Sequence, residues 1–152
     1  MEFVIKGRLD PTIVDWIVTL VSRHTVTPEL RLTIDVRPAR ADRRRLWGSC
    51  YYPRLLKNKS KRSPYRIVCH APGPWPIYLA IRNRPKAGRE WIPVYGRVRL
   101  NNCEEGVAFL VLHELFHFLS RSGAIPQCNN ELQADSFAIL HFRRFQKWRR
   151  TK

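Results

Sequence analysis

A long, strongly apolar stretch from Gly106 to Ser122, GVAFLVLHELFHFLSRS, constrains the fold more than any other feature of this chain. Asn102 followed three residues later by Glu105 forms a capping-box pattern, so a helix is expected to begin here. Gly123 is suited to ending that helix, and Pro126 prevents its immediate continuation. Because almost every position of the helix is apolar, it should be largely buried.

Few polar side chains interrupt this helix, and three of them form one pattern, His113-Glu114-Leu115-Phe116-His117. Residues four apart lie on the same face of a helix, one turn from each other. Two neutral imidazoles placed in this way can bind one zinc ion, with the glutamate beside the zinc-bound water as a general base. The competing interpretation is a buried helix that carries two histidines by accident.

A catalytic zinc usually has three protein ligands, so a third is expected downstream of the helix. Residues 118–140 contain no histidine, and Cys128, Glu131 and Asp135 are the candidates there. Glu131 is favoured because it lies near the start of a second helix that can fold back antiparallel to the first. Asp135, one turn later, could accept a hydrogen bond from the free N–H of a ligating histidine. Taken alone, each of these two acids would more often be an ordinary exposed helix residue.

The remaining segments predict an α+β fold in one domain, residues 1–152. Asp10-Pro11 is a favourable helix opening, and 12–24 has helical periodicity. The second helix should run from Asn129 or Asn130 toward Trp148. Strands are expected at 30–36, 46–52, 65–70, 77–82 and 91–100, separated by basic loops at 37–45 and 57–64 and a turn at 83–90. We expect a small, mostly antiparallel sheet, with Pro93 placing the start of the last strand at an edge.

The pentapeptide HELFH together with Glu131–Asp135, ELQAD, resembles the gluzincin clan of zinc metallopeptidases. The run ELQADSFAI (131–139) is also similar to the small ImmA/IrrE-type peptidases, and the short spacing suggests a minimal gluzincin. The resemblance covers about residues 102–142. It implies a zincin-like domain in which His113, His117 and Glu131 bind zinc, Glu114 is the base and Asp135 orients a histidine.

The basic charge and the segment WGSC (47–50) resemble a second family, the SprT-like DNA-associated peptidases. That family typically uses a third histidine as the zinc ligand, and this chain has none at a suitable distance. The gluzincin resemblance is therefore preferred.

The expected activity is that of a zinc metalloendopeptidase, a hydrolase in which zinc-activated water attacks a peptide bond and Glu114 transfers the proton. The protein or peptide substrate should bind in extended form at a sheet edge, for which 91–100 is one candidate. The residue that stabilises the oxyanion stays open between His70, Tyr95, His141 and Arg143.

Charge suggests a second class of function. The net charge is +16, and residues 37–100 hold 17 Lys and Arg against Asp42 and Glu90, with six more basic residues in the tail 143–152. Residues 104–135, in contrast, hold five acids and one base, Arg121. The positive surplus would attract nucleic acid or anionic lipid, although such charge also serves simply to keep a surface solvated.

The alternative to a peptidase is therefore a basic nucleic-acid-associated protein with a structural or vestigial zinc site. Trp47, Tyr51, Tyr52 and Tyr65 are interleaved with the basic residues and could stack bases. In such a protein Cys128 could close the zinc site as a fourth ligand. The two functions can also combine in a nucleic-acid-associated peptidase.

The four cysteines, Cys50, Cys69, Cys103 and Cys128, form no Cys-x-x-Cys pair, and reduced thiols are expected. The sequence contains no apolar run long enough to span a bilayer and no secretory signal at residues 1–10, so a cytoplasmic location is expected. Nothing in the sequence indicates the oligomeric state.

Overall fold

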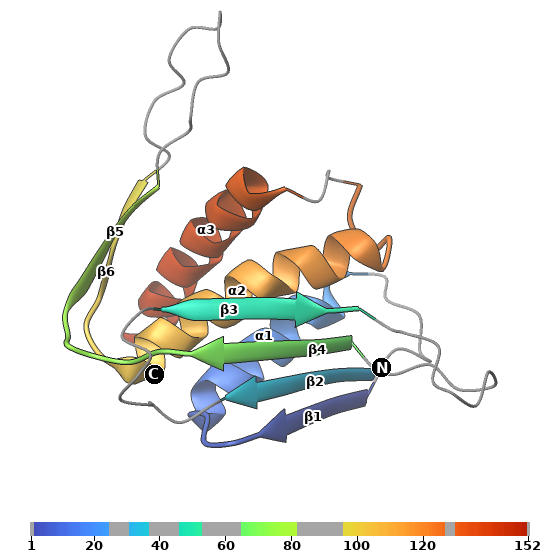
Figure 1. The fold of residues 1–152 in the computed structure, drawn as a ribbon, viewed down its shortest axis with the longest axis horizontal. Helices are drawn as coiled ribbons and strands as arrows, with labels where there is room; N and C mark the ends of the chain where they lie inside the picture. Colours follow the sequence, from blue (N-terminus) through green and yellow to red (C-terminus); the bar gives the residue numbers. More distant parts are fainter. Residues whose placement is uncertain are drawn as a thin grey trace, which may run out of the picture.

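The computed structural model describes residues 2–24, 31–36, 46–52, 65–81, 96–126 and 130–151. These residues form an α+β fold with three helices, as predicted (Figure 1). The elements follow one another as β1 (Glu2–Lys6), α1 (Pro11–Ser22), β2 (Arg31–Val36), β3 (Trp47–Tyr51), β4 (Tyr65–His70), β5 (Ile77–Ile81), β6 (Gly96–Leu100), α2 (Cys103–Arg121) and α3 (Glu131–Arg149).

The strands form two sheets. The larger sheet has the order β1-β2-β4-β3, in which β1 and β4 both run parallel to β2 and β3 runs antiparallel to β4. The smaller sheet is the antiparallel pair β5–β6. The prediction of a mostly antiparallel sheet is therefore wrong for the larger sheet, which is mixed. A parallel pair needs a crossover connection, and α1 provides it between β2 and β1, a strand that the sequence patterns did not predict.

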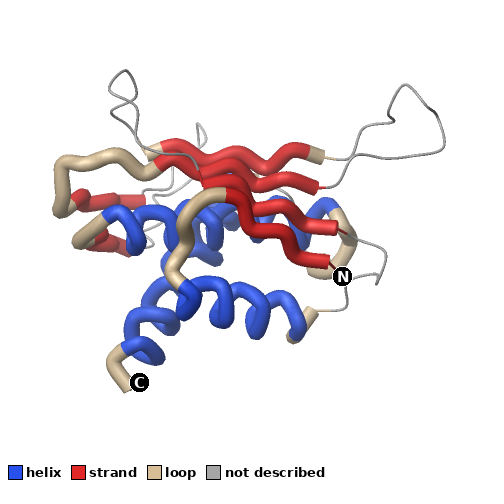
Figure 2. The backbone as a smooth tube through the Cα atoms, turned by 90° about the horizontal axis from the view of Figure 1, so that it is seen from below, coloured by secondary structure: helices blue, strands red, loops and turns tan. Residues whose placement is uncertain are grey.

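The helices pack on one face of the larger sheet, as Figure 2 shows in a view along that layer. Helix α2 lies directly beneath β3 and β4 (Figure 1). The core between them is apolar and closed to solvent, with side chains from both layers at most 1% exposed: Leu32, Ile34, Ile67, Leu112, Leu115, Phe118 and Leu119. The predicted burial of the apolar helix is thus confirmed.

The helix ends follow the chemistry expected from the sequence. The Asp10 carboxylate accepts a hydrogen bond from the Thr12 N–H at 2.7 Å, where α1 begins. The Asn102 side chain accepts from the Glu105 N–H at 2.9 Å and caps α2. Helix α2 ends at Arg121, and Gly123 follows with a φ of 75°, a left-handed conformation that glycine adopts without strain.

Some predictions lie outside the described residues: the basic loops at 37–45 and 57–64, the turn at 83–90, the first half of the strand at 91–100, and Cys128. Within the described part of the chain, no helix combines the length and the apolar character that a bilayer crossing requires. Cys50, Cys69 and Cys103 are free thiols.

Candidate metal centre

Helix α2 brings the two histidines of HELFH together, one turn apart, on the side that faces α3. Their imidazole rings lie edge to face, with centroids 5.1 Å apart. The Nε2 atoms of His113 and His117 are 3.3 Å from each other. Two ring nitrogens that approach so closely can both bind one ion placed between them.

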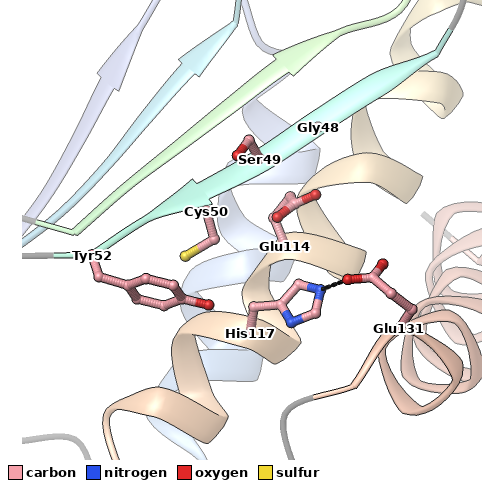
Figure 3. Close-up of a pocket in the computed structure, with 7 residues that line it drawn as sticks. All are labelled: Gly48, Ser49, Cys50, Tyr52, Glu114, His117 and Glu131. Carbon is pink, nitrogen blue, oxygen red and sulfur yellow. Dashed lines mark ion pairs between the residues drawn. The ribbon is translucent and has the colours of Figure 1, made fainter.

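Helix α3 brings the predicted third residue next to the two histidine Nε2 atoms. Asn130 caps the helix and Glu131 is its first residue, which fixes where the carboxylate stands. Glu131 Oε2 lies 3.1 Å from His113 Nε2. Glu131 Oε1 lies 3.4 Å from His117 Nε2 (Figure 3). The structure thus brings together the three residues predicted as metal ligands, across two helices.

Asp135, one turn after Glu131, lies on the other side of the His113 ring. Its Oδ1 atom is 2.9 Å from His113 Nδ1. A proton on Nδ1 donates to this carboxylate and leaves the Nε2 lone pair free for a metal. Burial lowers the pKa of His113, but the hydrogen bond to Asp135 and the nearby Glu114 charge outweigh it, so the net shift is upward.

The spacing of the three donors can be tested against zinc chemistry. Zn–N and Zn–O bonds of about 2.0–2.1 Å in a tetrahedral site place neighbouring donors about 3.3 Å apart. The shortest donor separations are 3.1, 3.3 and 3.4 Å, with Glu131 Oε2 nearest His113 and Glu131 Oε1 nearest His117. One ligand atom from each residue lies within 4.8 Å of the other two. A set of two imidazoles and one carboxylate is also a ligand set that zinc takes when a fourth position stays open. The residues therefore fit a zinc ion.

Glu114, the one acid of HELFH, lies against Gly48 of β3. Its side chain is buried, with 6% of the residue exposed, and its carboxylate accepts a hydrogen bond from the Cys50 backbone N–H. Burial raises the pKa of Glu114, while the charges of His113 and His117 oppose the rise. A carboxylate with a raised pKa can take up and release a proton closer to neutral pH.

These residues line one side of a cavity of about 250 Å³, and strand β3 lines the other side. Gly48, Ser49, Cys50 and Tyr52 come from β3 and the residue after it, opposite Glu114, His117 and Glu131 (Figure 3). Sequence reasoning noted the WGSC segment only as a family resemblance and did not place it at the site. Its signal was the small Gly48 in a predicted strand, which often marks a close approach of another group.

The residues considered for stabilising an oxyanion do not line this cavity where the structure describes them. His141 lies in a second cavity, beside Phe137, and Arg143 donates to the Arg97 carbonyl. His70 is buried on β4, with 2% exposed. Tyr95 lies outside the described residues. Tyr52, considered at first only as a base-stacking residue, turns its hydroxyl toward His117 instead (Figure 3).

Two neighbours hold the Tyr52 ring in this position. The Arg121 guanidinium lies over the ring, 4.7 Å from its centroid, and Tyr65 packs against it edge to face. Cys50 also reaches the cavity, but burial and the Glu114 charge raise the pKa of its thiol to about 12. Without a bound cation, the thiol therefore stays protonated at neutral pH.

Comparisons of this chain with protein-family models, with curated protein sequences and with solved structures gave no match.

Proposed function

We propose that the protein is a zinc-dependent metalloendopeptidase of the gluzincin type. The observation that carries the proposal is that His113, His117 and Glu131 each bring one donor atom within 4.8 Å of the others, beside a buried glutamate. The arrangement around this set also supports a zincin-like fold: the His-Glu-x-x-His helix lies under a sheet, and the next helix carries the third ligand.

His113, His117 and Glu131 would hold the zinc ion, which supplies the Lewis acidity that polarises a peptide carbonyl and acidifies water. Glu114 accepts a proton from the water molecule that adds to the carbonyl carbon. It then delivers this proton to the amine nitrogen as the C–N bond breaks, which returns the glutamate to its charged form. The raised pKa of Glu114 suits both transfers.

The substrate would bind along β3. Among the described strands β3 pairs only with β4, so a further strand could add along its other edge, next to the Cys50 N–H that donates to Glu114. An extended peptide added there would pass over Glu114 and His117, because β3 lines their cavity. This edge replaces the earlier candidate 91–100, whose described part pairs with β5 and packs beside α3. The Tyr52 hydroxyl at the end of the strand is placed to donate to the oxyanion.

A purely structural zinc site would need a fourth protein donor to close it. In the described residues the group of donors that can share one ion has three members, and Cys50 is not among them. Cys128 lies outside the described residues, and the lack of a fourth donor among the residues that are described favours catalysis.

Three substitutions test the proposal through peptide hydrolysis and zinc content. Glu114→Gln should keep stoichiometric zinc and lose hydrolysis by about 10²- to 10⁴-fold, while His117→Ala should lose the zinc as well. Tyr52→Phe should lower kcat by about 10²- to 10³-fold with little change in KM. Full activity of Glu114→Gln would refute the peptidase mechanism, and unchanged zinc content of His117→Ala would refute the metal site.

A further inference from the structure

The smaller sheet exposes a basic and aromatic face that the peptidase proposal does not use. On β6, Arg97 and Arg99 point to solvent while Val98 and Leu100 are buried. Tyr78 on β5 pairs directly with Arg99, so both side chains lie on the same face. The tyrosine is 70% exposed, and the Arg99 guanidinium lies 5.7 Å from its ring centroid.

Helix α3 stands beside β6 (Figure 1) and brings two more cations to the edge of this face, since a Cβ at Gly96, on the other face of β6, would meet Arg143. Arg143 Nη2 donates to the Arg97 carbonyl at 3.3 Å, which ties the helix to β6. Lys147 follows one helical turn later, and both side chains are exposed. We call Tyr78, Arg97, Arg99, Arg143 and Lys147 the hairpin–α3 surface.

No described carboxylate pairs with the four cations of the hairpin–α3 surface. Other arginines of the chain do have acidic partners: Arg66 pairs with Asp35, and Arg149 lies 3.6 Å from Glu104. Four positive charges gathered without counter-charges repel one another, and a polyanion relieves that repulsion. Among the described residues, the positive charge of this surface is therefore unbalanced.

We propose that the hairpin–α3 surface binds single-stranded nucleic acid, with Arg97, Arg99, Arg143 and Lys147 on the phosphates and a base stacked on Tyr78. The exposed tyrosine favours a single strand, because only unpaired bases offer their faces to an aromatic ring. An anionic membrane fits less well. The exposed apolar side chains here are Tyr78 and, on α3, Leu140, whereas membrane-surface helices bury a whole apolar face.

Binding of a labelled single-stranded oligonucleotide, in DNA and RNA versions, tests this by fluorescence anisotropy across a salt series. The double variant R97Q/R99Q should bind at least about tenfold more weakly. The slope of log K against log salt should fall by about 1.4, which is the loss of two phosphate contacts. The control R8Q/R23Q removes the same charge at the two ends of α1 and should change both quantities little. Equal weakening by the two double variants, or none by R97Q/R99Q, would overturn the assignment.

The stacking contribution is tested at Tyr78. Tyr78→Ala should weaken binding about 5- to 100-fold, while Tyr78→Phe keeps the ring and should bind like the wild type. Equal affinity of the alanine and phenylalanine variants would contradict stacking. Binding to vesicles containing phosphatidylserine, without binding to either oligonucleotide, would assign the surface to membranes instead. None of these substitutions touches the metal centre, so the peptidase proposal stands or falls separately.

Discussion

At the scale of single residues, the site depends on a position that has no side chain. Gly48 on β3 faces Glu114, and a Cβ built at Gly48 would lie 2.8 Å from Glu114 Oε1 and 3.0 Å from its Cγ. The glutamate can reach the Cys50 N–H only because this space is empty. Gly48 thus positions Glu114, the proposed general base, without any chemistry of its own.

Gly48→Ala should displace the Glu114 carboxylate and lower kcat by about 10²- to 10⁴-fold, the usual contribution of a general base. Zinc content should not change, because no metal ligand contacts this position. Gly96→Ala is the matched control: it is also a strand glycine, but its Cβ would meet the Arg143 and Ile139 side chains. Wild-type hydrolysis by Gly48→Ala would show that Glu114 does not need its observed position.

A second residue predicts how stability changes with pH. Burial lowers the pKa of His141 to about 4, with a smaller effect in the same direction from Arg144. The unfolded chain, with an ordinary histidine pKa of about 6.5, therefore binds a proton that the folded state excludes between these values. The contribution of neutral His141 to the free energy of unfolding is therefore fully present above about pH 6.5. It is lost as the pH falls toward 4, by up to about 3 kcal/mol.

Urea unfolding of the metal-free protein at about pH 7 and about pH 4.5 measures this loss. His141→Gln should flatten the pH dependence because glutamine does not titrate. His24→Gln is the comparison: burial lowers the pKa of His24 too, but this side chain is only half-buried and should matter less. An unchanged slope in His141→Gln would show that other groups cause the acid sensitivity.

At the scale of elements, the sequence predicted those with strong local signals. The capped apolar helix α2 and helix α3 agree with prediction to within a residue or two at each end, because caps and periodicity act locally. Strand β1 was missed because its five residues, EFVIK, carry charges at both ends and pair only with a distant strand, β2. Because β1 was not predicted, its parallel pairing with β2 was not predicted either.

The residues of the candidate site show the same difference between local sequence signals and long-range contacts. His113, His117 and Glu131 could be predicted because they lie on neighbouring helices joined by a short connection. The contribution of β3 could not, because Gly48 lies 66 residues from Glu114 in the sequence and only the sheet order brings them together. No local pattern encodes a contact of that kind.

The two helix caps offer a matched test of how an element positions a ligand. Asn130 accepts from the Gln133 N–H, and Asn102 accepts from the Glu105 N–H, both at 2.9 Å. Asn130→Ala and Asn102→Ala should each lower the free energy of unfolding by about 1 kcal/mol in urea unfolding. Only Asn130→Ala should also weaken zinc binding, by about tenfold in a chelator competition, because Glu131 follows it directly. Equal zinc affinities of the two variants would contradict this role of the cap.

At the scale of the whole molecule, α3 separates two regions of opposite charge. Glu131 and Asp135 lie in its first two turns and reach the metal centre, whereas Arg143 and Lys147 belong to the hairpin–α3 surface. Twelve residues of helix separate Glu131 from Arg143, which corresponds to about 18 Å. A nucleic acid on the hairpin–α3 surface would therefore hold proteins bound to the same strand close to β3.

Because its ligands come from α2 and α3, a bound zinc ion should stabilise the fold as a whole. Zinc at about 100 times its Kd would add about 2.7 kcal/mol, and its removal by chelation should lower Tm by about 5–10 °C. Glu131→Gln should lose most of this difference in thermal unfolding. Glu104→Gln, which changes a first-turn glutamate of α2 away from the ligands, should retain it. A chelator effect of equal size in both variants would place the metal elsewhere.

The open edge of β3 also bears on how the protein behaves at high concentration. Its five residues, WGSCY, include no charged side chain, and both Trp47 and Tyr51 are exposed. Natural sheets usually guard such an edge with charge, because an unguarded edge can pair with the same edge of another molecule. A strand that must accept a peptide cannot be guarded in this way. The net charge of +16 keeps the molecules apart instead, so raising the salt concentration should promote self-association and block the proposed substrate site along β3.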